Sequence, residues 1–231
     1  MTVAAEATTV YRREPLDTID GIPTFCARDP FTKNYDAIAA EHLAWMAKGT
    51  LNPWQATEGM LVLEGATAAF VRYLSNPGSR ILDVGVATGR VLALLPEWDR
   101  YGIDIARAYL RVAAELGIDV AVGRAEDLPY TDSTFDTVIA TDVLEHVLDL
   151  NAVVAEVMRV LRPGGIFVVR VPREEDLSQY LNASYRFLHL RKFDPASLRL
   201  LLTRIFPFEV LLETEVSASG GNEILVGARK P

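Results

Sequence analysis

The chain has 231 residues, of which 50% are hydrophobic and 23% are charged, and its formal net charge at pH 7 is -8. This composition supplies enough apolar side chains for a full core and excludes global disorder, so we expect one large α/β domain, with or without a small appendage. The acidic charge argues against extended nucleic-acid binding, which needs a basic surface.

Neither the cysteine content nor the hydropathy of the chain points outside the cytoplasm. Cys26 is the single cysteine, so an intrachain disulfide is excluded. Residues 1–12 lack the apolar core of a signal peptide. No stretch approaches the ~18 uninterrupted apolar residues that a membrane span requires. We therefore expect a cytoplasmic protein without a membrane partner.

The first 77 residues predict an arm followed by two helices. Residues 1–30 are mixed polar with three spaced prolines, which is typical of irregular backbone. Apolar side chains then recur at helical spacing, first from Phe31 to Met46 and again over about residues 55–74. The prolines and glycines at positions 53, 77 and 78 end these two segments.

A buried strand pattern over Arg80–Val84 leads into a loop of small residues. The strand carries the acid Asp83, and Gly85, Ala87 and Gly89 follow in alternate positions before a helical pattern. Such a strand, tight loop and helix bring backbone N–H groups close to a ligand. A nicotinamide dinucleotide site would need glycine at position 90, where this chain has Arg90, so we disfavour an oxidoreductase.

The next strand pattern, over residues 100–105, supports a nucleoside ligand. It contains Asp104, 21 positions after Asp83. A carboxylate about 20 residues on, at the tip of the neighbouring strand, is placed to accept hydrogen bonds from a ribose diol. The alternative is that Asp104 only caps the helix expected over residues 106–116. A third strand, over residues 119–122, precedes a polar loop.

Strand patterns recur in the second half of the chain, over residues 135–140, 166–171, 208–216 and 222–228. A helical pattern covers residues 151–160, and Asp194 followed by Pro195 is typical of the start of a last helix. Between these elements, residues 172–190 are polar with scattered aromatic side chains. We interpret this segment as an insertion that shapes a substrate pocket.

Five segments together resemble class I S-adenosylmethionine-dependent methyltransferases. They are the Asp83-x-Gly-x-Ala-x-Gly89 loop, Gly123-Arg-Ala-Glu-Asp-Leu-Pro-Tyr130, Val143-Leu-Glu-His-Val147, the Arg162-Pro-Gly-Gly turn and the His189-x-Arg-x-Phe helix entry. The resemblance implies a doubly wound α/β fold with a seven-stranded, mostly parallel sheet whose last strand is antiparallel. It also implies a helical lid over residues 31–77 and a cofactor-binding core over residues 78–231.

The same resemblance implies a set of residues that contact S-adenosylmethionine. Tyr35 resembles a tyrosine near the methionine end of the cofactor, and Arg124 replaces the acid that such enzymes carry beside adenine. The implied cofactor-binding residues are Tyr35, Asp83, Gly85, Ala87, Gly89, Asp104, Ile105, Ala125, Glu126 and Thr141.

Two hypotheses address how a hydroxyl acceptor would lose its proton. In the first, His146 is the general base, because the pKa of histidine lies near neutrality. In the second, a Mg²⁺ ion lowers the pKa of the acceptor hydroxyl. The residues that would hold this ion are Asp142, Glu145, His146 and His189. The segment resembles the metal site of ubiquinone-pathway O-methyltransferases, with Asp142 in place of a glutamate. A third interpretation is structural, with Glu145 bonded to backbone and His146 packed at the floor of the pocket.

These observations favour a methyltransferase that modifies a hydroxyl on a small molecule such as a sugar or natural product. One alternative is a catalytically inactive cofactor-binding protein that serves as a partner or regulator. Another is a nucleic-acid methyltransferase, which the net charge disfavours. For the oligomeric state, the assembly that we consider is a homodimer.

Overall fold

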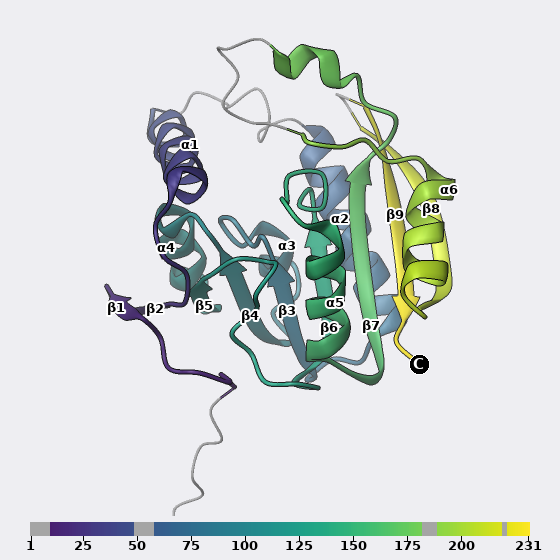
Figure 1. Ribbon diagram of the computed structural model, residues 1–231, viewed down its shortest axis with the longest axis horizontal. Coiled ribbons are helices and arrows are strands. Elements are labelled where there is room, and N and C mark those ends of the chain that lie inside the picture. The colour runs from purple at the N-terminus through teal and green to yellow at the C-terminus, as the bar shows by residue number, and fades with distance from the viewer. Residues whose placement is uncertain (1–9, 49–57, 182–188, 219–220) are drawn as a thin grey trace, which may run out of the picture.

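The computed structural model describes residues 10–48, 58–181, 189–218 and 221–231, and shows a twisted sheet with helices on both faces (Figure 1). The strands are β1 (Asp17–Ile19), β2 (Ile22–Thr24), β3 (Arg80–Val84), β4 (Asp99–Asp104), β5 (Asp119–Val122), β6 (Phe135–Thr141), β7 (Leu161–Pro172), β8 (Glu209–Ala218) and β9 (Gly221–Arg229). The helices are α1 (Pro30–Ala47), α2 (Glu58–Leu74), α3 (Arg90–Ala93), α4 (Arg107–Glu115), α5 (Leu150–Val160) and α6 (Pro195–Leu200). Short helical turns lie at η1 (Leu177–Leu181) and η2 (Leu201–Ile205).

The strand order is β1-β2-β5-β4-β3-β6-β7-β9-β8. Strands β5, β4, β3, β6 and β7 are parallel, and β9 runs antiparallel to both of its neighbours. The order reverses between β3 and β6, which pair with each other although the chain passes through β4 and β5 between them. In open α/β sheets, ligands bind at the carboxyl ends of the strands at such a reversal. The predicted α/β fold, with its mostly parallel sheet and antiparallel last strand, is confirmed.

The sheet contains two strands that the sequence analysis assigns to an irregular arm. Asp20 and Gly21, with φ angles of 56° and 78°, form the tight turn between β1 and β2. Aspartate followed by glycine is a strong signal for such a hairpin, so this correction to the predicted irregular backbone and to the predicted strand count was available from the sequence. The hairpin joins the sheet where Thr24 pairs with Val122 of β5.

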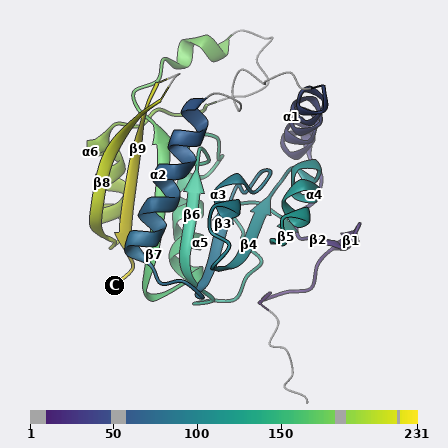
Figure 2. The same ribbon diagram turned by 180° about the vertical axis from the view of Figure 1, so that it is seen from behind.

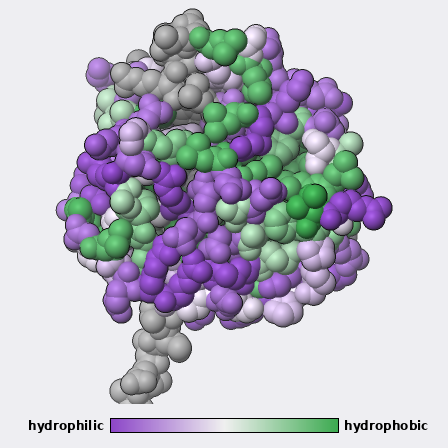
Figure 3. Space-filling model, in the orientation of Figure 1, coloured by the Kyte–Doolittle hydropathy of each residue, from purple (hydrophilic) through white to green (hydrophobic). Residues whose placement is uncertain are grey.

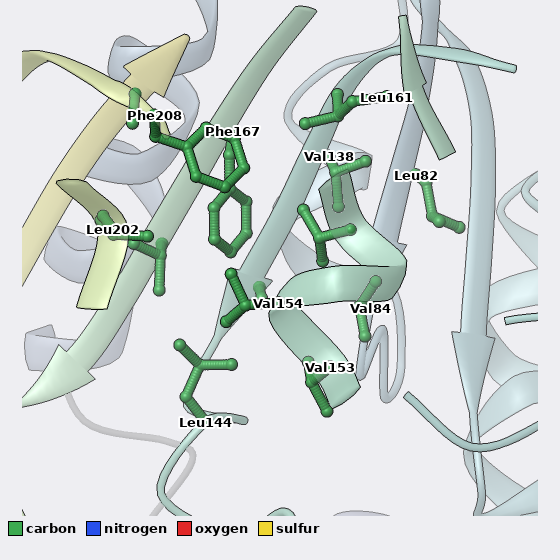
Figure 4. Close-up of a cluster of buried hydrophobic side chains, with 14 of the residues drawn as sticks. Leu82, Val84, Val138, Leu144, Val153, Val154, Leu161, Phe167, Leu202 and Phe208 are labelled. Atoms are coloured by element: carbon green, nitrogen blue, oxygen red, sulfur yellow. The ribbon is translucent and has the colours of Figure 1, made fainter. Parts of the chain in front are cut away.

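Alternating side chains of the central strands form two apolar cores. On one face, side chains of the sheet pack against α5, α6 and η2, and Phe167 and Phe208 lie in contact there with ring centroids 5.7 Å apart (Figure 4). On the other face, Ile81 and Val168 pack with residues of α2, α3 and α4. These three helices lie on that face of the sheet in Figure 2. Because successive residues of a strand point to opposite faces, the near-continuous apolar runs seen in the sequence belong to strands covered on both sides.

The two N-terminal helices occupy different positions. Helix α1 contacts α4 and begins with a capping box, in which Asp29 and Thr32 exchange side-chain and backbone hydrogen bonds of 2.9 Å. Helix α2 lies on the sheet along β7, β8 and β9. The division of the chain into an arm over residues 1–30, a lid over 31–77 and a core with an insertion over 172–190 stays a prediction, and residues 49–57 and 182–188 lie outside the described residues.

The surface on the side of α5 and α6 is mostly hydrophilic, with smaller apolar areas (Figure 3). Among the described residues, no helix combines the length and apolar character that a membrane crossing requires.

Truncating Phe167 tests the larger core. This side chain has no exposed surface, so Phe167→Ala is expected to lower the free energy of unfolding by about 3–5 kcal/mol through lost burial and a cavity. Leu200→Ala, at a position that is 56% exposed, is the matched control and should change it by less than ~0.5 kcal/mol. Urea unfolding followed by circular dichroism measures both, and equal losses would contradict the core assignment.

Candidate functional site

A cavity of about 230 Å³ opens at the carboxyl ends of β3, β4 and β6. Its wall includes most of the predicted cofactor-binding residues, namely Tyr35, Asp83, Gly85, Ala87, Asp104, Ile105, Ala125, Glu126 and Thr141. Asp142 and His146, from the predicted metal set, lie in the same wall. Gly89 lies outside this wall and begins α3. The structure therefore gathers predicted residues from five segments around one space.

The loop after β3 takes a backbone shape that only small residues tolerate well. Gly85 and Gly89 have φ angles of 77° and 80°, and Ala87 has a φ of 45°. A Cβ atom on Gly85 would clash with the side chain of Val143, and one on Gly89 would lie 2.6 Å from Cδ1 of Ile118. The loop thus keeps the β3 end, the 143–147 turn and α4 close together.

Asp104 fastens this loop to the tip of β4. Its Oδ2 accepts the N–H of Ala87 at 3.0 Å and its Oδ1 accepts the N–H of Ala106 at 2.8 Å. The carboxylate therefore positions the loop and also accepts a hydrogen bond from the start of α4. Asp104 thus contacts the start of this helix, as the alternative interpretation expected, and also lies in the cavity wall. Burial raises the pKa of Asp104 to about 6, against the opposing effect of the backbone N–H groups that it accepts.

The segment after β5 contributes Ala125 and Glu126 to the cavity wall. Glu126 accepts the N–H of Leu148 at 3.0 Å. Arg124, which stands where the resemblance expects an acid, forms an ion pair with Asp29 and lies over the ring of Phe31 at 5.2 Å from its centroid. The arginine thus joins the loop after β5 to the start of α1.

A buried arginine was absent from the residues predicted for the site. Arg170, on β7, is 1% exposed, lines the cavity, forms an ion pair with Asp142 and donates to the hydroxyl of Thr67 at 3.2 Å. Asp142 has a φ of 57°, a left-handed conformation that costs free energy in a residue other than glycine. A charged residue inside the apolar run Phe167–Val171 is the sequence signal that would have revealed Arg170.

Other cavity residues were likewise not predicted. Arg90, which the sequence analysis uses only to disfavour a dinucleotide, forms an ion pair of 2.8 Å with the buried Glu64 of α2. Phe31, Met60 and Tyr109 complete the apolar wall. No spacing in the sequence relates these positions to the loop, because they reach the cavity from separate helices.

His146 lies where the cavity meets the turn after β6. Its ring contacts Tyr35 edge-on, with centroids 6.1 Å apart, and His189 edge-on, with centroids 4.4 Å apart. The pKa of Tyr35 is raised by burial and then by Glu145, which keeps the phenol neutral. His146, the predicted base, is 7% exposed and forms part of the cavity wall.

Three carboxyl groups in the cavity wall or close to its residues have raised pKa values. Burial raises the pKa of Asp83 and of Glu145 well above their ordinary values. Burial and the nearby Asp142 raise the pKa of Glu223 to about 8, so this group is largely protonated at neutral pH. Oδ1 of Asp83 and both oxygens of Glu145 are buried without a hydrogen-bond partner among the described residues.

The predicted metal set is brought together only in part. Ligand atoms of Glu145, His146 and His189 lie within 4.8 Å of one another, the first two buried and the third partly buried. Asp142 is not among them, because its carboxylate is held by Arg170. The segment 142–146 forms a turn rather than the helix that would place all four groups on one face.

Comparison with known proteins identifies the domain. Residues 82–169 match a family described as a methyltransferase domain. The tRNA (carboxymethyluridine(34)-5-O)-methyltransferase of Arabidopsis thaliana is 33% identical over 161 residues, which cover 65% of this chain and 40% of that protein. The chain spans 40–60% of the lengths of the first curated relatives that it matches.

Solved structures share the fold at low identity. The N-methyltransferase NodS of Bradyrhizobium japonicum, solved with S-adenosyl-l-homocysteine, gives a TM-score of 0.68 at 16% identity over 86% of this chain and 99% of that chain. A Haloferax volcanii methyltransferase, solved in complex with the Trm112 methyltransferase activator, gives a TM-score of 0.69 at 18% identity over 87% of this chain and 97% of that chain.

Replacing Arg170 tests the buried ion pair. In Arg170→Met the carboxylate of Asp142, which is 34% exposed, loses its cation, so the free energy of unfolding is expected to fall by about 2 kcal/mol, less than for a fully buried pair. Arg199→Met is the control, because Arg199 is 55% exposed and pairs with Glu213 at the surface, where such pairs contribute about 0–1 kcal/mol. Urea unfolding at pH 7 measures both variants. A loss at Arg170 no larger than that at Arg199 would contradict a structural role for the buried pair.

Proposed function

We propose that this chain, whose residues 82–169 match a methyltransferase domain and whose fold is shared with S-adenosylmethionine-dependent methyltransferases, transfers a methyl group from S-adenosylmethionine to a hydroxyl of a small molecule. The proposed acceptor is a sugar or natural product, and the proposed location is the cytoplasm. The observation that carries the proposal is the single cavity that contains both the Asp104-bound loop and His146.

The residues present fit this cofactor. We infer that Asp104 accepts the ribose hydroxyls at the tip of β4, and Ala125 contributes to the wall of the same cavity. The unpartnered Oδ1 of Asp83 would be satisfied by a cationic group of the ligand. The lining of Tyr35 and other apolar side chains would enclose a ligand and exclude water.

The proposed reaction asks little covalent chemistry of the protein. The bound sulfonium supplies an activated methyl group, whose C–S bond breaks toward sulfur as the acceptor oxygen forms its bond to carbon. The cavity walls hold the acceptor in line with that carbon, and this proximity is the largest contribution that the protein makes. The acceptor also loses its proton, and the role of His146 as the base that takes it stays a prediction.

A second candidate function is methylation of RNA. The net charge of the chain argues against a nucleic-acid substrate, but that expectation is not supported, since a relative 33% identical over 161 residues is named as a tRNA methyltransferase. Local basic side chains such as Arg12 and Arg13 lie on the surface, although both pair with Asp127.

A turnover assay with methyl-labelled S-adenosylmethionine separates these functions. We expect label to move to a hydroxyl of at least one compound in a panel of sugars and natural products. Transfer to tRNA instead would favour the second function. Cofactor binding without transfer to any acceptor would favour an inactive binding protein, which the intact loop alone does not exclude. Absence of calorimetric heat with both the cofactor and S-adenosylhomocysteine, in folded protein, would overturn the proposal.

Asp104→Asn tests the ribose contact. The neutral amide loses two charge-assisted hydrogen bonds, so affinity for S-adenosylhomocysteine should fall by roughly 100-fold, which corresponds to about 3 kcal/mol. Glu115→Gln removes the same charge from an exposed position of α4 and should leave affinity unchanged. Isothermal titration calorimetry gives both values, and unaltered binding by Asp104→Asn would show that the ribose lies elsewhere.

The pH dependence of binding offers an independent check. With its pKa raised to about 6, Asp104 is ionised above that pH and accepts ribose hydroxyls, whereas below it the carboxyl must first lose a proton. Affinity for S-adenosylhomocysteine should be constant above about pH 7 and weaken below pH 6, by up to roughly tenfold per pH unit. In Asp104→Asn this dependence should disappear. A wild-type profile that stays flat down to pH 5 would refute the assignment.

A further inference from the structure

We propose that Glu145, His146 and His189 form a binding site for one divalent transition-metal ion, of the class of Zn²⁺, Mn²⁺, Fe²⁺ or Co²⁺, at the acceptor end of the cavity. The inference rests on the position of three side chains, on an unsatisfied buried carboxylate and on the residues that hold the second imidazole. It assigns neither Mg²⁺ nor Asp142 to the site.

The three side chains already lie at nearly the spacing of metal ligands. One ligand atom from each lies within 4.8 Å of the others, and the Glu145 Oε1 to His146 Nε2 distance is 3.9 Å. Ligand atoms around Zn²⁺ are 2.0–2.2 Å from the metal and roughly 3–4 Å from one another. Small side-chain rotations would therefore complete the coordination.

The carboxylate of Glu145 needs a positively charged partner. The side chain is 1% exposed, and neither of its oxygens has a hydrogen-bond partner among the residues that the structure describes. Arg191, on the segment attached to this turn, donates to the carbonyl of Leu144, and Arg170 donates to Asp142 and to Thr67. A buried carboxylate without a partner is costly, and a metal ion between it and two imidazoles would supply the missing interaction.

His189 is held as metal-binding imidazoles usually are. Its Nδ1 contacts the carboxylate of Glu175 and lies 3.2 Å from the hydroxyl of Tyr180, which itself donates to Glu175 at 2.5 Å. A carboxylate on one ring nitrogen fixes the tautomer and directs the other nitrogen to the metal. We therefore assign Glu175 as the residue that orients His189.

Backbone contacts fix the two ligand segments relative to each other. The N–H of Leu190 donates to the carbonyl of Glu145 at 2.8 Å, and Arg191 donates to the carbonyl of Leu144 at 2.6 Å. The ligand from the 189–191 segment is thus attached to the turn that carries the other two. Such pre-organisation keeps the entropic cost of binding low.

The donor set determines the class of metal. Imidazole nitrogen suits Zn²⁺, Fe²⁺, Co²⁺ and related ions, whereas Mg²⁺ and Ca²⁺ prefer oxygen ligands. Two imidazoles and one carboxylate leave coordination positions open, and His146 lies in the cavity wall. An acceptor oxygen could occupy an open position and have its pKa lowered there, a consequence that rests on the proposed methyl transfer. A ring nitrogen that binds metal cannot also take a proton, so in the metal-bound protein His146 is a ligand rather than the base.

Metal binding by the purified, chelator-stripped protein tests the site without any methyl acceptor. Calorimetric titration with Zn²⁺ and with Mn²⁺ is expected to show one ion per chain, and Mg²⁺ should compete poorly. Glu145→Gln and His189→Ala should each weaken Zn²⁺ binding by at least ~100-fold, and Glu175→Gln by roughly 10–100-fold. Asp142→Asn should retain wild-type Zn²⁺ affinity, which separates this set of ligands from one that includes Asp142.

A measurement on the unaltered chain keeps the test decisive if a variant fails to fold. Electron paramagnetic resonance of bound Cu²⁺ should show couplings from two imidazole nitrogens. Absence of stoichiometric binding of Zn²⁺ and Mn²⁺, or Zn²⁺ binding that is equally strong in folded Glu145→Gln and His189→Ala, would overturn the proposal. Failure of metal binding alongside intact binding of S-adenosylhomocysteine would leave the proposed function standing.

Discussion

The carboxylate of Asp104 is the contact on which the geometry of the site depends. By accepting N–H groups from Ala87 and Ala106, it joins the loop after β3, the tip of β4 and the start of α4. The parallel sheet brings these ends to one edge, but pairing of strands alone does not set the path of the loop beyond them. Two hydrogen bonds to one buried acid do so, and they leave the same carboxylate at the cavity surface for a ligand.

Charge is distributed unevenly around the cavity. Asp83, Glu145 and Glu223 are acids whose pKa values are raised by burial, while Arg170 is a cation with almost no exposed surface. A charged group can be buried when a partner compensates for the free energy lost on removing it from water. Arg170 compensates Asp142 through one carboxylate oxygen. Among the described residues, Oδ1 of Asp83 and both oxygens of Glu145 are buried without a hydrogen-bond partner, as are Oδ1 of Asp142 and Oε2 of Glu223. The acids thus mark the places where a cationic cofactor and a metal ion would bring the missing charge.

The sequence predicts the central part of this molecule well, for physical reasons. Buried parallel strands need continuous apolar runs, and a loop with positive φ needs small residues, so both leave strong local patterns around Asp83 and Asp104. Contacts between distant segments leave no such local pattern in the sequence. The Arg170 to Asp142 pair, the support of His189 by Glu175 and the docking of α2 on the sheet depend on how distant segments meet. The β1–β2 hairpin differs from these, since its Asp20-Gly21 turn is local and readable.

That hairpin has a consequence for handling the protein. Through Thr24 and Phe25, the N-terminal segment pairs with the backbone of Val122 at the end of β5, where unpaired edge groups would otherwise offer a template for association between molecules. Removing the first 25 residues as dispensable would uncover that edge, and self-association in the shortened chain would then reflect lost shielding rather than a native oligomer.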